Sequence, residues 1–125
     1  MKKINQICSL SIYKLIRLIT LDFLKDIKHI DKHVAFTTGN TIINKLTSLI
    51  IIFRKCYNSK DKEKIDYVLQ LKDEIEEIYL LLKFTTDIVH NVKIGKYIEN
   101  LSELTEQVKS WEISLNKKKE ENNMI

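Results

Sequence analysis

Apolar residues recur at steps of three and four through most of the chain, the period of a helix with one buried face. The first row comprises Ile12, Leu15, Ile16, Ile19, Phe23, Ile27 and Ile30. It predicts a helix over residues 9–29. Asp31 can cap the segment that follows, and we expect a turn over residues 33–40, unless Gly39 already lies in the first turn of the next helix.

The second predicted helix, residues 37–57, carries the broadest apolar surface of the chain. Its apolar positions are Ile42, Ile43, Leu46, Leu49, Ile50, Ile51, Ile52, Phe53 and Cys56. A surface of this width needs cover on more than one side, either within the chain or from another subunit.

Two further helices show heptad spacing. The third predicted helix covers residues 61–90 and follows a cap at Asn58 and Ser59. Its apolar positions are Val68, Leu71, Ile75, Ile78, Leu82 and Val89. A break over residues 91–95 precedes the fourth. That helix has one row at Ile94, Leu101, Val108 and Leu115 and a second at Tyr97, Leu104 and Trp111. The charged tail, residues 117–125, is expected to fray.

Four amphipathic helices with short connections predict an all-α fold, an antiparallel up-down-up-down four-helix bundle, because short loops force neighbouring helices to be antiparallel. The absence of Pro and the presence of only two Gly among 125 residues favour long helices over many short strands. The length is that of one domain with its own core. Residues 1–125 are therefore expected to form a single domain.

Charge is divided unevenly along the chain. Residues 1–60 contain 11 Lys or Arg and 3 Asp or Glu, whereas residues 61–125 contain 10 and 14. On the first predicted helix the basic residues fall within a sector of roughly 80°, at about 100° per residue, opposite the apolar face. They are Lys14, Arg17, Lys25, Lys28 and Lys32. Such a stripe could follow the phosphate backbone of RNA or DNA, and a solvated helix face remains the alternative.

Leu18 and Leu21 lie on or near this basic sector, where a monomer would favour polar side chains. Together with the broad apolar second helix, they predict a contact with another subunit or a partner protein. Scattered exposed leucines are common on protein surfaces, which is the alternative reading.

The sequence offers little catalytic chemistry. His29 and His33 are four residues apart but flank a predicted helix boundary, and residues 87–90 supply only half of a di-iron motif, so we expect no metal and no cofactor. No Gly-rich phosphate loop or nucleophile motif is present, which argues against an enzyme. The longest unbroken apolar run, residues 49–53, is too short to span a membrane, and we expect no signal peptide. With two cysteines and no framework spacing, a cytoplasmic setting is expected.

Three stretches resemble a known group of proteins. They are HVAFTTGNTI at residues 33–42, the Asp-, Glu- and Lys-rich opening of the third helix, and YIENLSEL at residues 97–104. The chain is similar over residues 13–115 to the four-helix bundle family of rRNA intervening-sequence proteins and Avd, the accessory variability protein of diversity-generating retroelements. It departs from the family pattern at Thr41, where a basic residue is common, and at residues 109–111, where a Gly-containing pattern is common.

The resemblance implies a homo-oligomer, a pentamer in that family, that binds nucleic acid and a partner reverse transcriptase. We therefore expect a non-catalytic accessory protein that binds nucleic acid and protein. The alternative is an oligomeric scaffold that binds only protein.

Overall fold

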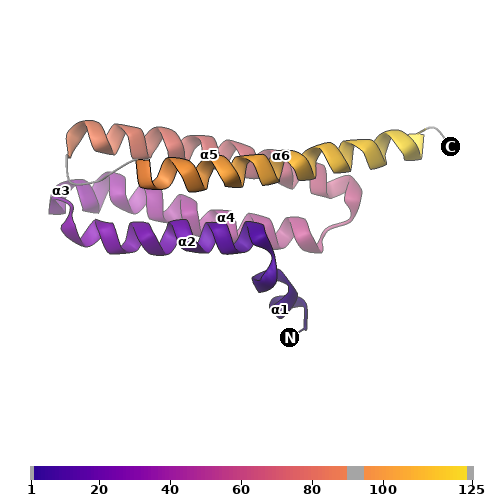
Figure 1. Ribbon diagram of the computed structural model, residues 1–125, viewed down its shortest axis with the longest axis horizontal. Coiled ribbons are helices and arrows are strands. Elements are labelled where there is room, and N and C mark those ends of the chain that lie inside the picture. The colour runs from indigo at the N-terminus through magenta and orange to yellow at the C-terminus, as the bar shows by residue number, and fades with distance from the viewer. Residues whose placement is uncertain (1, 90–94, 124–125) are drawn as a thin grey trace.

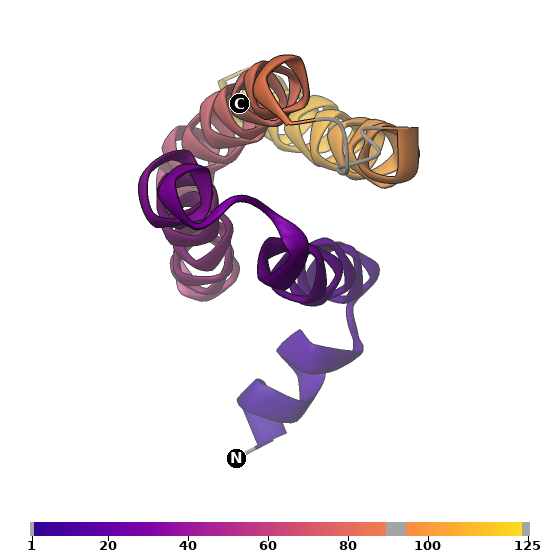
Figure 2. The same ribbon diagram turned by 90° about the vertical axis from the view of Figure 1, so that its left-hand side faces the viewer.

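The computed structural model describes residues 2–89 and 95–123, and all regular secondary structure within these two ranges is helical. Four long helices, α2 (Ser11–Asp26), α4 (Asn40–Asn58), α5 (Asp61–Ile88) and α6 (Gly95–Asn123), lie side by side (Figures 1 and 2). Helix α2 contacts α4 and α6, and α5 contacts the same two helices. This arrangement encloses one cluster of buried apolar residues.

The N-terminal helix differs from the prediction. Residues 9–29 are not one helix, because Leu10 takes an extended conformation with φ −75° and ψ 142°. A separate helix, α1 (Lys2–Ser9), precedes this break and projects from the bundle (Figure 1). Ile7 anchors it in the core, with 8% of its surface exposed. Beyond Asp26 the chain continues as a 3₁₀ turn, η1 (Ile27–His29).

The turn before α4 also lies earlier than predicted. The chain reverses at Ile30 and Asp31, and Asp31 Oδ1 accepts a hydrogen bond of 2.9 Å from the backbone N–H of His33, which confirms its predicted role as a cap. Residues 32–39 are already helical, as α3 (Lys32–Val34) and a π-helical turn, η2 (Ala35–Gly39). Gly39 therefore lies within helical structure, at φ −60° and ψ −44°.

Gly39 permits the 3₁₀ turn to pack closely against this segment. A Cβ atom at Gly39 would lie 2.8 Å from Ile27 Cδ1 and 3.3 Å from Ile27 Cγ1. Because the backbone of Gly39 is ordinary right-handed helix, steric contact with Ile27 is the reason that a side chain is disfavoured there.

The broad apolar surface of α4 is covered largely within the chain. Leu46, Leu49 and Phe53 are fully or almost fully buried, and Ile43, Ile50 and Ile52 pack against the core at its edges. The exception is Ile51, which is 52% exposed. The width of this helix is thus explained by its two neighbours, α2 and α5, and does not itself require a second subunit.

The long C-terminal helices follow most of their predicted heptad positions, but Trp111 is only partly buried, and Val89 lies just after the end of α5 in an extended conformation. Val68, Leu71, Ile75, Ile78 and Leu82 are buried on α5, and Tyr97, Leu101, Leu104, Val108 and Leu115 on α6. Helix α5 begins at Asp61, but Ser59 does not cap it: its hydroxyl donates to the carbonyl of Lys55 at the end of α4. Helix α6 extends to Asn123, past the predicted onset of fraying. His90 and Ile94 lie outside the described residues.

Candidate nucleic-acid interface

Helix α2 separates apolar and basic side chains by its period. Leu15, Ile16, Ile19 and Phe23 face the core, and the buried hydroxyl of Thr20 donates back to the carbonyl of Ile16 at 2.7 Å. The side chains of Lys14, Arg17 and Lys25 lie on the exposed side of the same helix. Burial of the apolar row therefore fixes the direction in which these three cations point.

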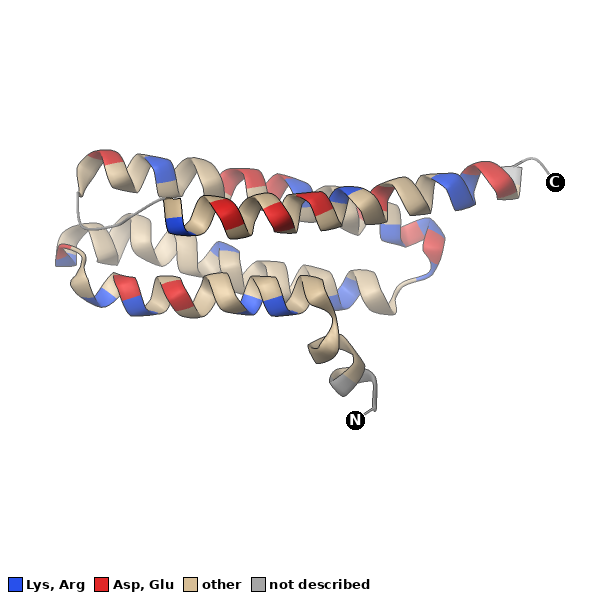
Figure 3. Ribbon diagram, in the orientation of Figure 1, with Lys and Arg blue, Asp and Glu red and all other residues tan. Residues whose placement is uncertain are grey.

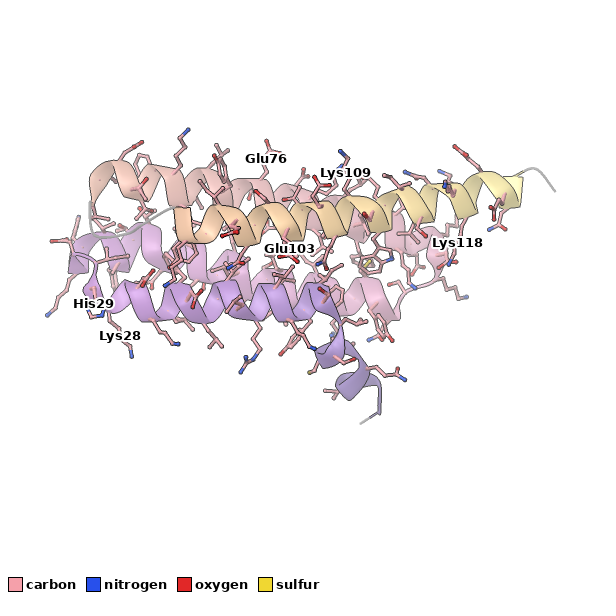
Figure 4. All side chains as sticks on the ribbon, in the orientation of Figure 1. Lys28, His29, Glu76, Glu103, Lys109 and Lys118 are labelled. Atoms are coloured by element: carbon pink, nitrogen blue, oxygen red, sulfur yellow. The ribbon has the colours of Figure 1, made fainter. Side chains whose placement is uncertain are left out.

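The other two predicted cations lie beyond the end of α2. Lys28 is in the 3₁₀ turn η1, and Figure 4 shows it pointing away from the bundle at the end where α2 leads into α3. Lys32 is the first residue of α3, after the reversal at Ile30 and Asp31. All five predicted residues are exposed, but the stripe is not one straight row. It runs along α2 to Lys28 in η1 and continues at Lys32, beyond the reversal of the chain at Ile30 and Asp31. We call the segment from η1 to η2, residues 27–39, the corner after α2.

None of these five cations makes an ion pair within residues 2–89 and 95–123. Other lysines do. Lys72 lies 3.0 Å from Glu112, and Lys45 lies between Glu77, to which it donates a hydrogen bond, and Glu74 at 3.7 Å. The hydrogen bond to Glu77 is the main reason that the pKa of Lys45 is raised. The basic residues of the stripe thus differ from these lysines in having no carboxylate at ion-pair distance among the described residues.

Leucines interrupt the basic residues on the outer side of α2. Leu18 is 45% exposed, Leu21 37% and Leu24 39%. Single exposed leucines are ordinary, but three on one 16-residue helix beside its cations make a face that is both basic and apolar. The two residues predicted as an oligomer or partner contact, Leu18 and Leu21, are therefore available for one.

Acidic residues border the basic stripe on one side. Asp22 and Asp26 lie on α2 itself, and Figure 3 shows acidic positions recurring along the first half of α6, the helix that packs beside α2. Glu99, Glu103 and Glu106 are the exposed ones. A polyanion that contacts α2 would be repelled from this border, so it would have to approach from the side away from α6.

The corner after α2 holds a residue that sequence periodicity did not single out. Phe36, in the π-helical turn η2, is 77% exposed, more than any other large apolar side chain among the described residues. It follows Lys32 by four residues. The signal in the sequence was an aromatic residue outside every predicted apolar row, four residues after Lys32 and three after His33.

His29 and His33 do not share a helix. His29 ends the 3₁₀ turn and His33 lies in α3, with the reversal at Ile30 and Asp31 between them. In the described part of the chain, no group of three or more His, Cys, Asp or Glu is arranged to hold a metal ion.

A shallow groove of about 570 Å³ lies where the start of α2 meets the end of α4 and the middle of α6. Its apolar lining includes Phe53, Tyr57 and Trp111, with Glu103 and Glu106 at its edge. Phe53 and Trp111 pack edge to face with ring centroids 5.8 Å apart. Because these aromatic rings pack α4 against α6, helix packing explains the aromatic lining of the groove.

No family model matches the chain, and no curated protein or solved structure matches it. Within the described ranges, the helices are too short or too polar to cross a lipid bilayer.

Proposed function

We propose that this protein is a non-catalytic accessory protein that binds the phosphate backbone of RNA or DNA through α2 and the corner that follows it. One observation carries the proposal: five cations, Lys14, Arg17, Lys25, Lys28 and Lys32, are exposed and have no ion-pair partner among the described residues. Their pattern matches an extended anion better than a single small one.

Counterion release is the physical basis of such binding. Each phosphate that a lysine or arginine neutralises releases condensed cations, so affinity falls as salt rises. Five contacts predict a slope of log K against log salt of about −3.5 for a single strand and about −4.5 for a duplex. Four of the five residues are lysines, which act as point charges without the bidentate geometry that reads guanine, so base preference should be slight.

The proposal extends to assembly and partners. The resemblance to the Avd family favours a homo-oligomer, pentameric in that family, that works beside a reverse transcriptase. Two cysteines without framework spacing favour a cytoplasmic setting. The resemblance also favours an antiparallel up-down-up-down order of the four long helices. Support for this order comes from the short connections: Ser59 and Lys60 alone join α4 to α5, and the chain reverses within Ile30 and Asp31 after α2.

A second candidate is a scaffold that binds only protein. Leu18, Leu21 and Leu24 favour it, because a backbone contact has no use for apolar side chains between its cations. In this case the cations would face acidic side chains of a partner, and the leucines would form the centre of the contact.

The test is binding of fluorescently labelled RNA and DNA to the full chain, measured by anisotropy over a range of salt. We expect micromolar or weaker affinity that falls steeply with salt. Changing Lys14, Arg17, Lys25 and Lys28 together to Glu should abolish binding and leave the helical circular dichroism unchanged, since all four side chains point into solvent.

A matched control changes the same amount of charge elsewhere. Lys62, Lys83, Lys109 and Lys117 are exposed and make no ion pair within the described ranges, so their change to Glu should not unfold the protein. Binding should fall far less in this control than in the α2 variant. Equal losses in the two variants would show that only net charge matters. Full binding by the α2 variant at low salt would rule out nucleic-acid binding through α2 and favour the protein-only scaffold.

A further inference from the structure

The corner after α2 combines an exposed aromatic ring with exposed cations. Lys32 and Phe36 are four residues apart in a continuous helical stretch, α3 followed by η2, so they lie on neighbouring turns of the same side. Both side chains are exposed, and Lys28 precedes them in the 3₁₀ turn. An exposed ring one helical turn from Lys32, in a segment that packs against the turn that carries Lys28, is the kind of combination that proteins use to hold a nucleic-acid base and its phosphates.

The backbone that carries Phe36 is held in place by side chains on either side of it. Thr37 Oγ1 donates to the carbonyl of His33 at 2.9 Å, and Asn40 Nδ2 donates to the carbonyl of Phe36 itself at 2.8 Å. Gly39, one turn further along, is buried against Ile27. Little backbone freedom would therefore be lost when a ligand stacks on the ring, which favours binding.

The charge around the corner favours an anionic ligand. Between Asp31 and Asp61 the sequence contains no Asp or Glu, so η2 and all of α4 contribute only positive or neutral side chains. Asp31 is engaged as the cap of α3, and Asp26 accepts a hydrogen bond from Tyr97. A protein partner would meet no acidic side chain from η2 or α4 themselves, and Glu74 and Glu77 of α5, which lie at α4, are paired with Lys45.

We propose that Phe36 is a stacking platform for an unpaired base, and that Lys28 and Lys32 hold the flanking phosphates, so that the preferred ligand is single-stranded nucleic acid. This rests on the proposed function and makes it more specific. The basic stripe alone would bind any phosphate backbone, whereas a stacking ring selects strands whose bases are exposed.

The deciding experiment compares two labelled 15-mers, oligo(dT) and an abasic strand with the same number of phosphates, with U15 as the RNA counterpart. Stacking of one base should make the parent protein bind oligo(dT) about 5- to 150-fold more tightly than the abasic strand. Phe36→Ala should bring this ratio close to one while leaving affinity for the abasic strand unchanged. Phe36→Trp should preserve the ratio, because Trp offers a comparable stacking face.

Phe84→Ala is the matched control, since Phe84 is an exposed phenylalanine, 54% exposed, on a helix that carries none of the five cations, and its removal should leave the ratio unchanged. A parent ratio near one, with both strands bound, would overturn the stacking role and leave backbone binding intact. No binding of either strand would overturn the proposed function itself. If Phe36→Ala keeps the ratio but weakens self-association in sedimentation velocity, Phe36 is a protein contact and the stacking proposal is wrong.

Discussion

The hydroxyl of Tyr97 on α6 donates a hydrogen bond to Asp26 Oδ2 at the end of α2, across 71 residues of sequence. Lys96 lies 3.6 Å from the same carboxylate oxygen, and the ring of Tyr97 packs edge to face with Phe23 at 6.1 Å between centroids. The side chain of Tyr97 is fully buried. One carboxylate thus joins α2, which carries the candidate interface, to α6, which borders it. Because Tyr97 and Lys96 engage this carboxylate, it is less available to repel a bound phosphate.

Tyr97→Phe tests this link. It removes the hydroxyl and keeps the buried ring, so we expect a loss of about 1–2 kcal/mol in the free energy of unfolding. Asp26 is partly exposed and keeps Lys96, which limits the loss. Urea unfolding followed by circular dichroism measures it. Tyr79→Phe is the control, because the Tyr79 hydroxyl has no hydrogen-bond partner within the described ranges. Equal stability of Tyr97→Phe and the parent would show that the link contributes nothing.

Cys56 makes stability depend on pH. Its side chain is fully buried, and this burial raises the pKa of the thiol to about 12 from 9.0. The raised pKa means that the unfolded chain releases this proton first, so the stabilisation is complete below pH 9 and declines as pH rises toward 12. Between pH 8 and 10 we expect the thiol to account for a loss of about 1.4 kcal/mol.

The measurement is urea unfolding at pH 8 and pH 10 under reducing conditions, for the parent and for Cys56→Ala. The alanine variant is less stable at both pH values because the substitution leaves a cavity. Its free energy of unfolding should fall less between pH 8 and pH 10 than that of the parent, because the variant lacks the contribution of the thiol. Identical pH dependence in the two proteins would contradict a raised pKa for the Cys56 thiol in the folded state. The pKa of Tyr97 is also raised, first by burial and then by its hydrogen bond to Asp26. Tyr97 contributes equally to the pH dependence of the parent and of Cys56→Ala.

Gly39 and Ile27 should show energetic coupling. Alanine is favoured over glycine within a helix by roughly 0.5–1 kcal/mol, but in the parent its Cβ would meet Ile27 Cδ1. Ile27→Val removes that terminal methyl. We therefore expect Gly39→Ala to stabilise the Ile27→Val protein and to give little or no gain in the parent. A thermal-unfolding double-mutant cycle measures the difference, and simple additivity would mean that Ile27 moves aside freely.

Leu18 and Leu21 test self-association. If they form a subunit contact, Leu18→Gln with Leu21→Gln should shift sedimentation velocity profiles toward the 14.8 kDa monomer, because desolvation of the leucines no longer favours assembly. Leu69→Gln with Leu80→Gln, on the exposed side of α5, is the matched control and should leave the profile unchanged. A parent protein that is already monomeric at micromolar concentration would contradict the oligomer proposal.

The long helices could be predicted from sequence because a heptad repeats often enough to fix their buried face. The rows that contain Leu71 and Leu82, and Leu104 and Val108, are buried as their spacing indicates. The ends of the helices were harder to predict. Leu10 is neither Gly nor Pro and gives no sequence signal for a break, yet its extended backbone interrupts the helix there. Ser59 can cap a helix on either side of it, and its hydroxyl bonds backward to Lys55.

The candidate site was predictable in its cations and not in its shape. Helical spacing placed Lys14, Arg17 and Lys25 on one exposed side. It could not show that Lys32 lies beyond a reversal of the chain, because the reversal depends on a capping bond from His33 to Asp31 and on contact between Ile27 and Gly39. Phe36 was missed for the same reason: its exposure results from the corner after α2, which no single period encodes.

The contacts between α2 and α6 have a consequence for the order of folding. The other principal contacts between long helices join elements that are consecutive in sequence, whereas this pair closes a loop of about seventy residues. Closing that loop costs entropy before its contacts form, so we expect it to be the late step, reached after α4 and α5 have already paired. The seam between α2 and α6 should then be among the first to open, and amide protons along it should exchange with solvent faster than those between α4 and α5.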